Sequence, residues 1–151
     1  MTRALIVVGT ALALLIGGLV VAVVLTRSHD KIQVDNVLSE DFTRDVQLAG
    51  ADGAQVDVRE LAPFAWSRAL VVAPGTSHAA LEQRLGYAWD GLQGLEQGRA
   101  MVVLLDGAGK VVRFFEYRGD GQFEGFDTPI ADVPRARAIF RAKDLVIRPE
   151  K

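Results

Sequence analysis

The hydrophobic positions of this chain fall into two regions with different patterns. From Ala4 to Leu25, apolar residues run on without a single charge. Beyond residue 32, apolar positions are spaced at helical intervals in some stretches and alternate with polar ones in others. An uninterrupted run of this length is typical of a membrane span, whereas spaced positions indicate amphipathic elements around a core. The pattern predicts an N-terminal span and one domain.

The first region, residues 4–25, is expected to be an uncleaved transmembrane anchor after a short head at residues 1–3. As a helix rising ~1.5 Å per residue, it would be just over ~30 Å long, enough to cross a hydrocarbon core. A cleaved signal peptide is the alternative, but its apolar region usually has only ~7–15 residues. The bulky Val23 and Leu25 also leave no small-residue cleavage site before Thr26.

The orientation of this anchor depends on the flanking charges. Only Arg3 precedes the span, and Arg27, Lys31 and Arg44 follow it, so a count of positive charges would place the domain in the cytoplasm. However, a very short head is typical of signal anchors, and long domains translocate largely regardless of charge. We therefore expect a single-pass membrane protein with its C-terminal domain outside the cytoplasm.

Small residues within the span form one further pattern. Gly9, Ala13 and Gly17 are spaced by four and share one face of the helix. Small residues at this spacing let two membrane helices approach closely, which favours a homo-oligomer formed through the span. The alternative is that glycine and alanine are simply common in such segments.

Residues 26–53 are expected to form a juxtamembrane helical segment, because apolar residues recur at spacings of three and four from Ile32 to Leu48. Residues 54–151 are expected to form an α+β domain. Its predicted strands cover residues 54–58, 69–73, 100–105, 110–117, 136–142 and 145–148, the last two joined by a turn at Lys143-Asp144. Residues 118–133, rich in glycine and acids, are expected to be a long excursion between hairpins.

A short amphipathic helix is predicted between the second and third strands. Thr76 or Ser77 can cap its start, Leu81 and Leu85 lie one turn apart on its buried face, and Gly86 ends it. In the last hairpin, the side chains expected to face the core are Ala138, Phe140, Leu145 and Ile147. The resulting fold class is one antiparallel sheet with one or two helices packed on a single face.

The helix and its surroundings resemble a known group of proteins. Gly75-Thr76-Ser77, then Leu81, then Leu85-Gly86 is similar to the helix motif of the SmpA/OmlA (BamE-like) envelope proteins. The β-lactamase-inhibitor-protein-like folds share a similar unit, a helix followed by an antiparallel sheet. The resemblance covers residues 64–148. It departs from the family pattern in having no lipobox cysteine and a strand before the helix. It implies a small bacterial envelope protein that acts mainly by binding other proteins. On this resemblance, the anchor would lie in the bacterial inner membrane and the C-terminal domain in the periplasm or otherwise outside the cytoplasm.

Composition excludes several classes of function. The net charge of −2 gives no basis for nucleic-acid binding, and the absence of cysteine excludes thiol catalysis and thiolate metal sites. Two isolated histidines, His29 and His78, supply no catalytic triad, so we expect no enzyme activity, with a hydrolase as the alternative. Residues 120–127 lack the spacing of a calcium loop, and no phosphate-binding loop is present, so we expect no metal or cofactor.

A protein-contact surface is the remaining candidate site. On the strand beginning at Lys110, alternation places Val111, Arg113, Phe115 and Tyr117 on the face away from the short helix. Arginine and aromatic residues of this kind are enriched at binding hot spots. The contact candidates are Arg113, Phe115, Tyr117, Trp66 and Trp89. The alternatives are that the tryptophans belong to the core, and that residues 118–133 or the helix at residues 32–48 cover this face.

The expected function is therefore a membrane-anchored envelope protein that serves as a protein-binding or assembly module. The alternative is a periplasmic inhibitor or immunity-type protein that blocks an enzyme by surface contact.

Overall fold

The structure, a computed structural model, describes residues 32–91, 98–127 and 129–150. In these ranges the helical elements are α2 (Asn36–Asp52), α3 (Val58–Leu61), α4 (His78–Leu85) and the 3-10 turn η2 (Arg135–Arg137). The strands are β1 (Gln55–Asp57), β2 (Arg68–Val72), β3 (Met101–Leu105), β4 (Val111–Glu116), β5 (Gln122–Phe123), β6 (Ile130–Pro134), β7 (Ile139–Lys143) and β8 (Val146–Pro149). The expected span at residues 4–25, with Gly9, Ala13 and Gly17, lies outside these ranges.

Helix α2 follows from the apolar spacing that predicted it. It begins where the side chain of Asp35 accepts a hydrogen bond from the N–H of Leu38 at 3.0 Å. It ends at Gly53, whose φ of +69° is a left-handed conformation that glycine adopts without a Cβ clash. The apolar residues of its buried face are Leu38, Phe42, Val46 and Ala49.

The most apolar strands form the middle of a central sheet. Its strand order is β4-β3-β2-β6, and every neighbouring pair is antiparallel. In the inner strand β3 every residue is buried, and in β2 every residue after Arg68 is buried. Their nearly continuous apolar sequences are explained by this position, because neither face of these strands meets water.

The second sheet is smaller and built mainly from the end of the chain. Its order is β1-β7-β8-β5, in which β7 and β8 form an antiparallel hairpin and the two-residue β5 pairs with β8 in parallel. Phe140 of β7 and Ile147 of β8 are fully buried. This sheet therefore contributes large side chains to the core between the two sheets.

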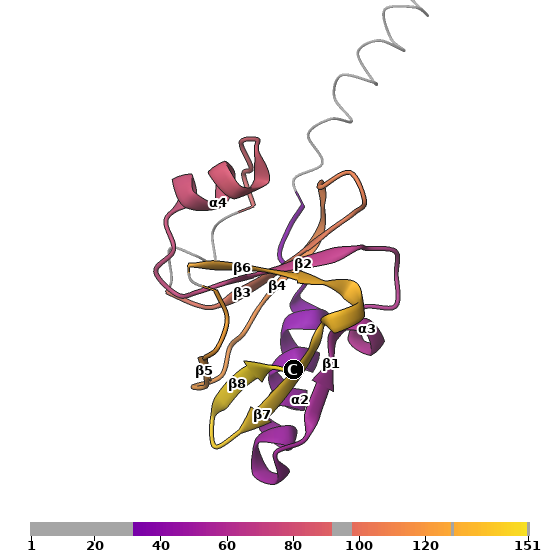
Figure 1. The fold of residues 1–151 in the computed structure, drawn as a ribbon, viewed down its shortest axis with the longest axis vertical. Helices are drawn as coiled ribbons and strands as arrows, with labels where there is room; N and C mark the ends of the chain where they lie inside the picture. The colour runs from indigo at the N-terminus through magenta and orange to yellow at the C-terminus, as the bar shows by residue number, and fades with distance from the viewer. Residues whose placement is uncertain (1–31, 92–97, 128, 151) are drawn as a thin grey trace, which may run out of the picture. The chain divides into compact units, whose positions relative to one another are not determined.

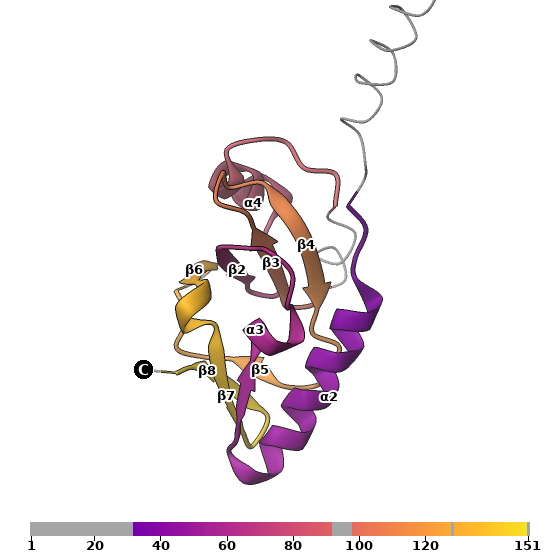
Figure 2. The same cartoon turned by 90° about the vertical axis from the view of Figure 1, so that its right-hand side faces the viewer.

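Both faces of the central sheet are covered, as Figures 1 and 2 show. On one face, α4 encloses a core of Leu70, Val72, Leu81, Trp89, Met101, Val103, Leu105, Val111 and Phe114. On the other face, α2 and the second sheet enclose a larger core centred on Phe42, Phe115, Tyr117 and Phe140. The two cores are separated by the sheet itself, since successive side chains of a strand point to opposite faces.

The α+β class is confirmed, but the expected arrangement of one sheet with helices on a single face is wrong. Two four-stranded sheets are present, and the central one is covered on both sides. The interval 118–133, expected to be an excursion, contains β5 and β6. Because glycines and acids are frequent in this interval, the sequence pattern did not predict the short strand β6. This strand, Ile130-Ala131-Asp132-Val133-Pro134, pairs with β2 along its whole length.

The expected transmembrane architecture is also corrected. Across the described ranges, no helix has the length and apolar character needed to cross a membrane. The longest helix there, α2, has 17 residues and carries Asp41, Arg44 and Asp45 on its surface side. The fold class that included a spanning helix, and the inner-membrane localisation that depended on it, are not supported by the structure.

The final hairpin turns one residue later than expected. Asp144 and Leu145 both have positive φ, 51° and 63°, and together form the turn between β7 and β8. Leu145 is therefore 58% exposed, whereas Ala138, Phe140 and Ile147 are buried as expected. Paired positive φ angles match the right-handed twist of the strands, which explains why the turn accepts a leucine in this unusual conformation.

Candidate functional site

The strand face expected to bind a partner lies inside the protein. Phe115 is 1% exposed and Tyr117 is 3% exposed. Phe42 of α2 packs on both of them, with ring centroids 5.1 Å and 6.1 Å away. Of the arrangements considered from the sequence, the one observed is that the helix near residues 32–48 covers this face. These two aromatic side chains stabilise the core and present no surface to a partner.

A bulge further changes which residues of β4 share a face. Leu104 pairs with Arg113 but Leu105 pairs with Val111, so Val112 is an extra residue in the strand. An extra residue reverses the alternation on one side of it. Val111 consequently joins Phe114 in the core under α4 instead of sharing a face with Phe115.

Both tryptophans also belong to the cores. Trp66 is 5% exposed, and its indole N–H donates to the carbonyl of Ala62 at 2.8 Å. Trp89 is 7% exposed and meets the ring of Phe114 edge-on at 4.9 Å. The indole rings therefore fill core volume, and Trp66 additionally satisfies its polar group internally.

Arg113 is the contact candidate whose side chain is exposed, but its positive charge is already compensated within the protein. The guanidinium forms an ion pair with Asp35 at 2.7 Å and lies 4.6 Å from the ring centre of Phe64. Because Asp35 also caps α2, Arg113 joins the start of that helix to β4.

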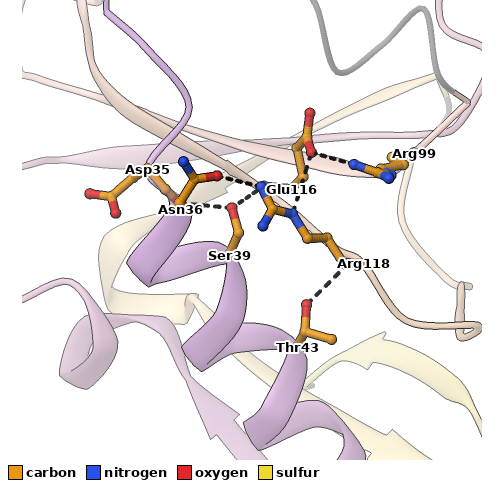
Figure 3. A network of polar contacts seen from close by, with 7 residues as sticks. All are labelled: Asp35, Asn36, Ser39, Thr43, Arg99, Glu116 and Arg118. Atoms are coloured by element: carbon orange, nitrogen blue, oxygen red, sulfur yellow. Dashed lines mark hydrogen bonds and ion pairs between the residues drawn. The ribbon is translucent and has the colours of Figure 1, made fainter.

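Helix α2 closes the outer edge of β4, here called the β4 edge. Strand register directs the backbone groups of Phe114, Glu116 and Arg118 away from β3. The carbonyl of Phe114 accepts from the N–H of Asp35 at 2.9 Å. The hydroxyl of Ser39 accepts from the N–H of Glu116 at 3.1 Å. One helical turn later, Thr43 accepts from the N–H of Arg118 at 3.0 Å, as Figure 3 shows.

The side chains around the β4 edge complete this closure. The carboxylate of Glu116 is almost buried and meets Arg99 at 3.0 Å and Arg118 at 3.7 Å. Arg118 also donates to the amide oxygen of Asn36. Buried polar groups are costly unless they are hydrogen-bonded, and each of these groups has a partner. The network is a structural link between α2 and β4.

The outer edge of β6, here called the β6 edge, has no such cover from the residues that the structure describes. Ala131 and Val133 pair with β2, so the N–H groups of Ile130 and Asp132 point away from the sheet. Within the described ranges, neither of these N–H groups has a hydrogen-bond partner. With five residues, β6 is longer than β1 and β5, the edge strands of the second sheet.

A cavity lies beside the β6 edge. It has a volume of about 230 Å³ and is lined by residues 131–134, by Gly125, Phe126 and Asp127, by Arg137, and by Pro149 and Glu150. Four consecutive residues of β6 line it, from both faces of the strand, which places it against the strand's edge. The β6 edge and this cavity form the candidate functional site.

The arginine at this site differs from most others in the protein. Nine of the eleven arginines in the described ranges form ion pairs with carboxylates: Arg44, Arg59, Arg68, Arg84, Arg99, Arg113, Arg118, Arg141 and Arg148. The other two, Arg135 and Arg137, form none with the described carboxylates, and both belong to η2, directly after β6. Arg135 stacks over Trp66 at 5.1 Å, which leaves Arg137 as the exposed cation in the cavity wall.

The described residues show no group of acidic or histidine side chains that could hold a metal ion. His78 has a structural contact: its Nε2 lies 3.1 Å from the carbonyl of Trp89, so this nitrogen donates there. Glu82, one turn along α4, accepts from the N–H of Trp89 at 3.0 Å. Together they attach the loop after α4 to the helix, while His29 lies outside the described residues.

Comparison with known proteins adds no family to this geometry: no protein-family model, no curated protein and no solved structure matches the chain. The resemblance to SmpA/OmlA (BamE-like) envelope proteins is neither supported nor opposed by these comparisons. The site residues that sequence reasoning missed are Ile130, Asp132 and Arg137. The signal available for them was limited to the strand-favouring residues Ile130 and Val133, because Ala131 and Asp132 between them are of types depleted in strands.

Proposed function

We propose that this domain is a protein-binding module that acts by surface contact, and that an extended segment of its partner adds to β6 as a further strand. The β6 edge beside its cavity carries the proposal. Unpaired N–H and carbonyl groups on an edge strand are a template for another chain, and adjacent hollows give room for its side chains.

The edge is restricted in a way that favours a specific partner. Pro134 at the end of β6 has no N–H to donate, so pairing is limited to the donors of Ile130 and Asp132. Proline and charged residues on edge strands are devices against indiscriminate association. A short edge of this kind suits a segment of defined length better than open-ended stacking of sheets.

The test uses two variants at one position. Asp132→Ala removes the ion pairs to Arg68 and Arg84 but keeps the backbone N–H, whereas Asp132→Pro removes both. Because this N–H points outward, both variants should fold with melting temperatures close to each other. The full-length chain is used to select binders from a displayed library of random heptapeptides.

The selected peptides should bind the wild type and Asp132→Ala with equal affinity. Their affinity for Asp132→Pro should be lower by a factor of about ten or more, because the proline removes one backbone hydrogen bond and its ring blocks the approach of the peptide. Fluorescence polarisation with labelled peptides measures this. Failure to enrich any peptide, or equal binding to both variants, would contradict strand addition at β6.

A further inference from the structure

We infer that the segment added to β6 carries one acidic side chain, which Arg137 binds beside the strand. This inference rests on the proposed function and specifies the chemistry of the partner. It depends on three features of the described residues: the arginine left without a carboxylate, the charges that share its cavity, and the size of that cavity.

The first feature is the availability of Arg137. Its neighbour Arg135 is held in place by Trp66, through its ring at 5.1 Å and its carbonyl at 3.5 Å. This contact and the bond from the Arg135 N–H to the carbonyl of Ser67, at 2.9 Å, attach η2 to the start of β2. Arg137 follows in the same 3-10 turn with its side chain exposed, and it forms no ion pair with a described carboxylate.

The second feature is the charge of the remaining cavity wall. Two of its three carboxylates already form ion pairs: Asp132 with Arg68 and Arg84, and the Oε1 atom of Glu150 with Arg141 at 3.0 Å. The Oε2 atom of Glu150 is buried and has no hydrogen-bond partner among the described residues. Asp127 is the third, and it forms no ion pair with a described arginine. Three carboxylates near one cation disfavour the binding of a polyanion such as nucleic acid. A single carboxylate can still pair directly with Arg137.

The third feature is size. A cavity of about 230 Å³ is smaller than the ~300–1,000 Å³ that is usual for small-molecule sites. It suits one or two side chains projecting from an added strand. Guanidinium and carboxylate groups form a geometrically matched, charge-assisted pair, so an aspartate or glutamate at this position would align the register of the segment on β6.

The experiment compares matched peptides and matched proteins. Each acidic peptide selected on the full-length chain is synthesised with its glutamate or aspartate and again with glutamine or asparagine. Both forms are titrated against the wild type, Arg137→Gln and, as a control for a distant exposed arginine, Arg44→Gln. We expect Arg137→Gln to weaken the acidic peptide about two- to fivefold, to leave the amide peptide unchanged, and to lose its effect in high salt. Arg44→Gln should change neither.

The outcomes separate the inference from the proposed function. If peptides bind in a manner sensitive to Asp132→Pro but show no preference for an acid and no response to Arg137→Gln, strand addition stands and the acidic partner is refuted. If no peptide depends on Asp132, the proposed function itself fails. Sedimentation of the full-length chain adds one outcome: a dimer lost in Asp132→Pro but kept in Asp132→Ala would show that a second copy occupies the edge, which would overturn the acidic partner.

Discussion

The two edges of the central sheet are treated in opposite ways. At the β4 edge, Asp35, Ser39 and Thr43 of one helical face satisfy successive outward backbone groups, and the aromatic side chains beneath are buried by Phe42. At the β6 edge, the N–H groups of Ile130 and Asp132 have no described partner. Since an uncovered edge invites pairing with another chain, the difference indicates where this domain is closed and where it can receive a partner.

The largest expected effect is a loss of stability when the packing of α2 on β4 is removed. Phe42 is fully buried against Phe115, Tyr117 and Phe140. Phe42→Ala should lower the free energy of unfolding by about 3–5 kcal/mol in urea melts, because it leaves a cavity between helix and sheet. Val37→Ala, on the same helix at a 68% exposed position, should stay within about 0.5 kcal/mol. Similar small losses in both variants would show that α2 does not cover β4.

The next effect isolates one hydrogen bond at the β4 edge. Ser39 is fully buried and accepts from the N–H of Glu116. Ser39→Ala leaves this buried N–H without a partner and should cost about 1–3 kcal/mol in the same urea melts. Thr43→Val, which removes the acceptor for the more exposed Arg118 N–H, should cost less. A larger loss for Thr43→Val than for Ser39→Ala would argue against the closure described here.

A third measurement compares both edges in one sample. Amide hydrogen exchange of the unmodified chain is followed by NMR. The N–H of Glu116 should exchange more slowly than the N–H of Asp132 by a factor of about ten or more. Tenfold protection requires only about 1.4 kcal/mol of local stability. The N–H of Ala131, bonded to β2, serves as the protected reference within β6. Equal protection of Asp132 and Ala131 would mean that the β6 edge is covered.

The smallest expected effect concerns pH at the end of β4. Burial raises the pKa of the Tyr117 phenol, a shift opposed by the hydrogen bond from the Gly121 N–H and increased by Asp120. A folded-state pKa above the unfolded one means that this contribution to stability is complete below about pH 10 and declines as pH rises through the folded value. Urea melts between about pH 8 and pH 11 should show the decline.

The control for this effect is Tyr117→Phe, whose stability should fall less steeply over the same pH range. The phenol oxygen is packed so closely on Gly119 and Gly121 that a Cβ at either glycine would overlap it. An identical alkaline decline in the wild type and Tyr117→Phe would assign the pH dependence to another group.

Several local elements could be read directly from the chain. The start of α4 at Ser77, whose hydroxyl accepts from the N–H of Ala80, and its end at Gly86 with φ of +82° agree with the capping residues expected. Leu81 is fully buried as expected, whereas Leu85 is only partly covered. These features are local, because capping and helical periodicity depend on residues within one or two turns.

The candidate site could not be read in this way. Alternation correctly grouped Phe115 with Tyr117, but it could not show that Phe42 covers them, and the bulge at Val112 moved Val111 to the other face. A strand with one exposed face and a strand with both faces buried can have the same sequence pattern. The pattern does not distinguish them when the element that covers the second face comes from elsewhere in the chain.

Some features of this protein follow from neighbouring residues alone: the apolar face of α2, the caps of α4, and the buried runs of β2 and β3. Which edge of the central sheet is closed depends on contacts between distant segments. Ser39 and Glu116 are 77 positions apart in the chain. The residues around a helical serine do not indicate which strand its hydroxyl will contact. Likewise, Arg137 is recognised as having no ion pair among the described residues only after the carboxylates around the other arginines have been placed. Edge closure and charge compensation depend on pairing between distant segments, and folding alone brings those segments together.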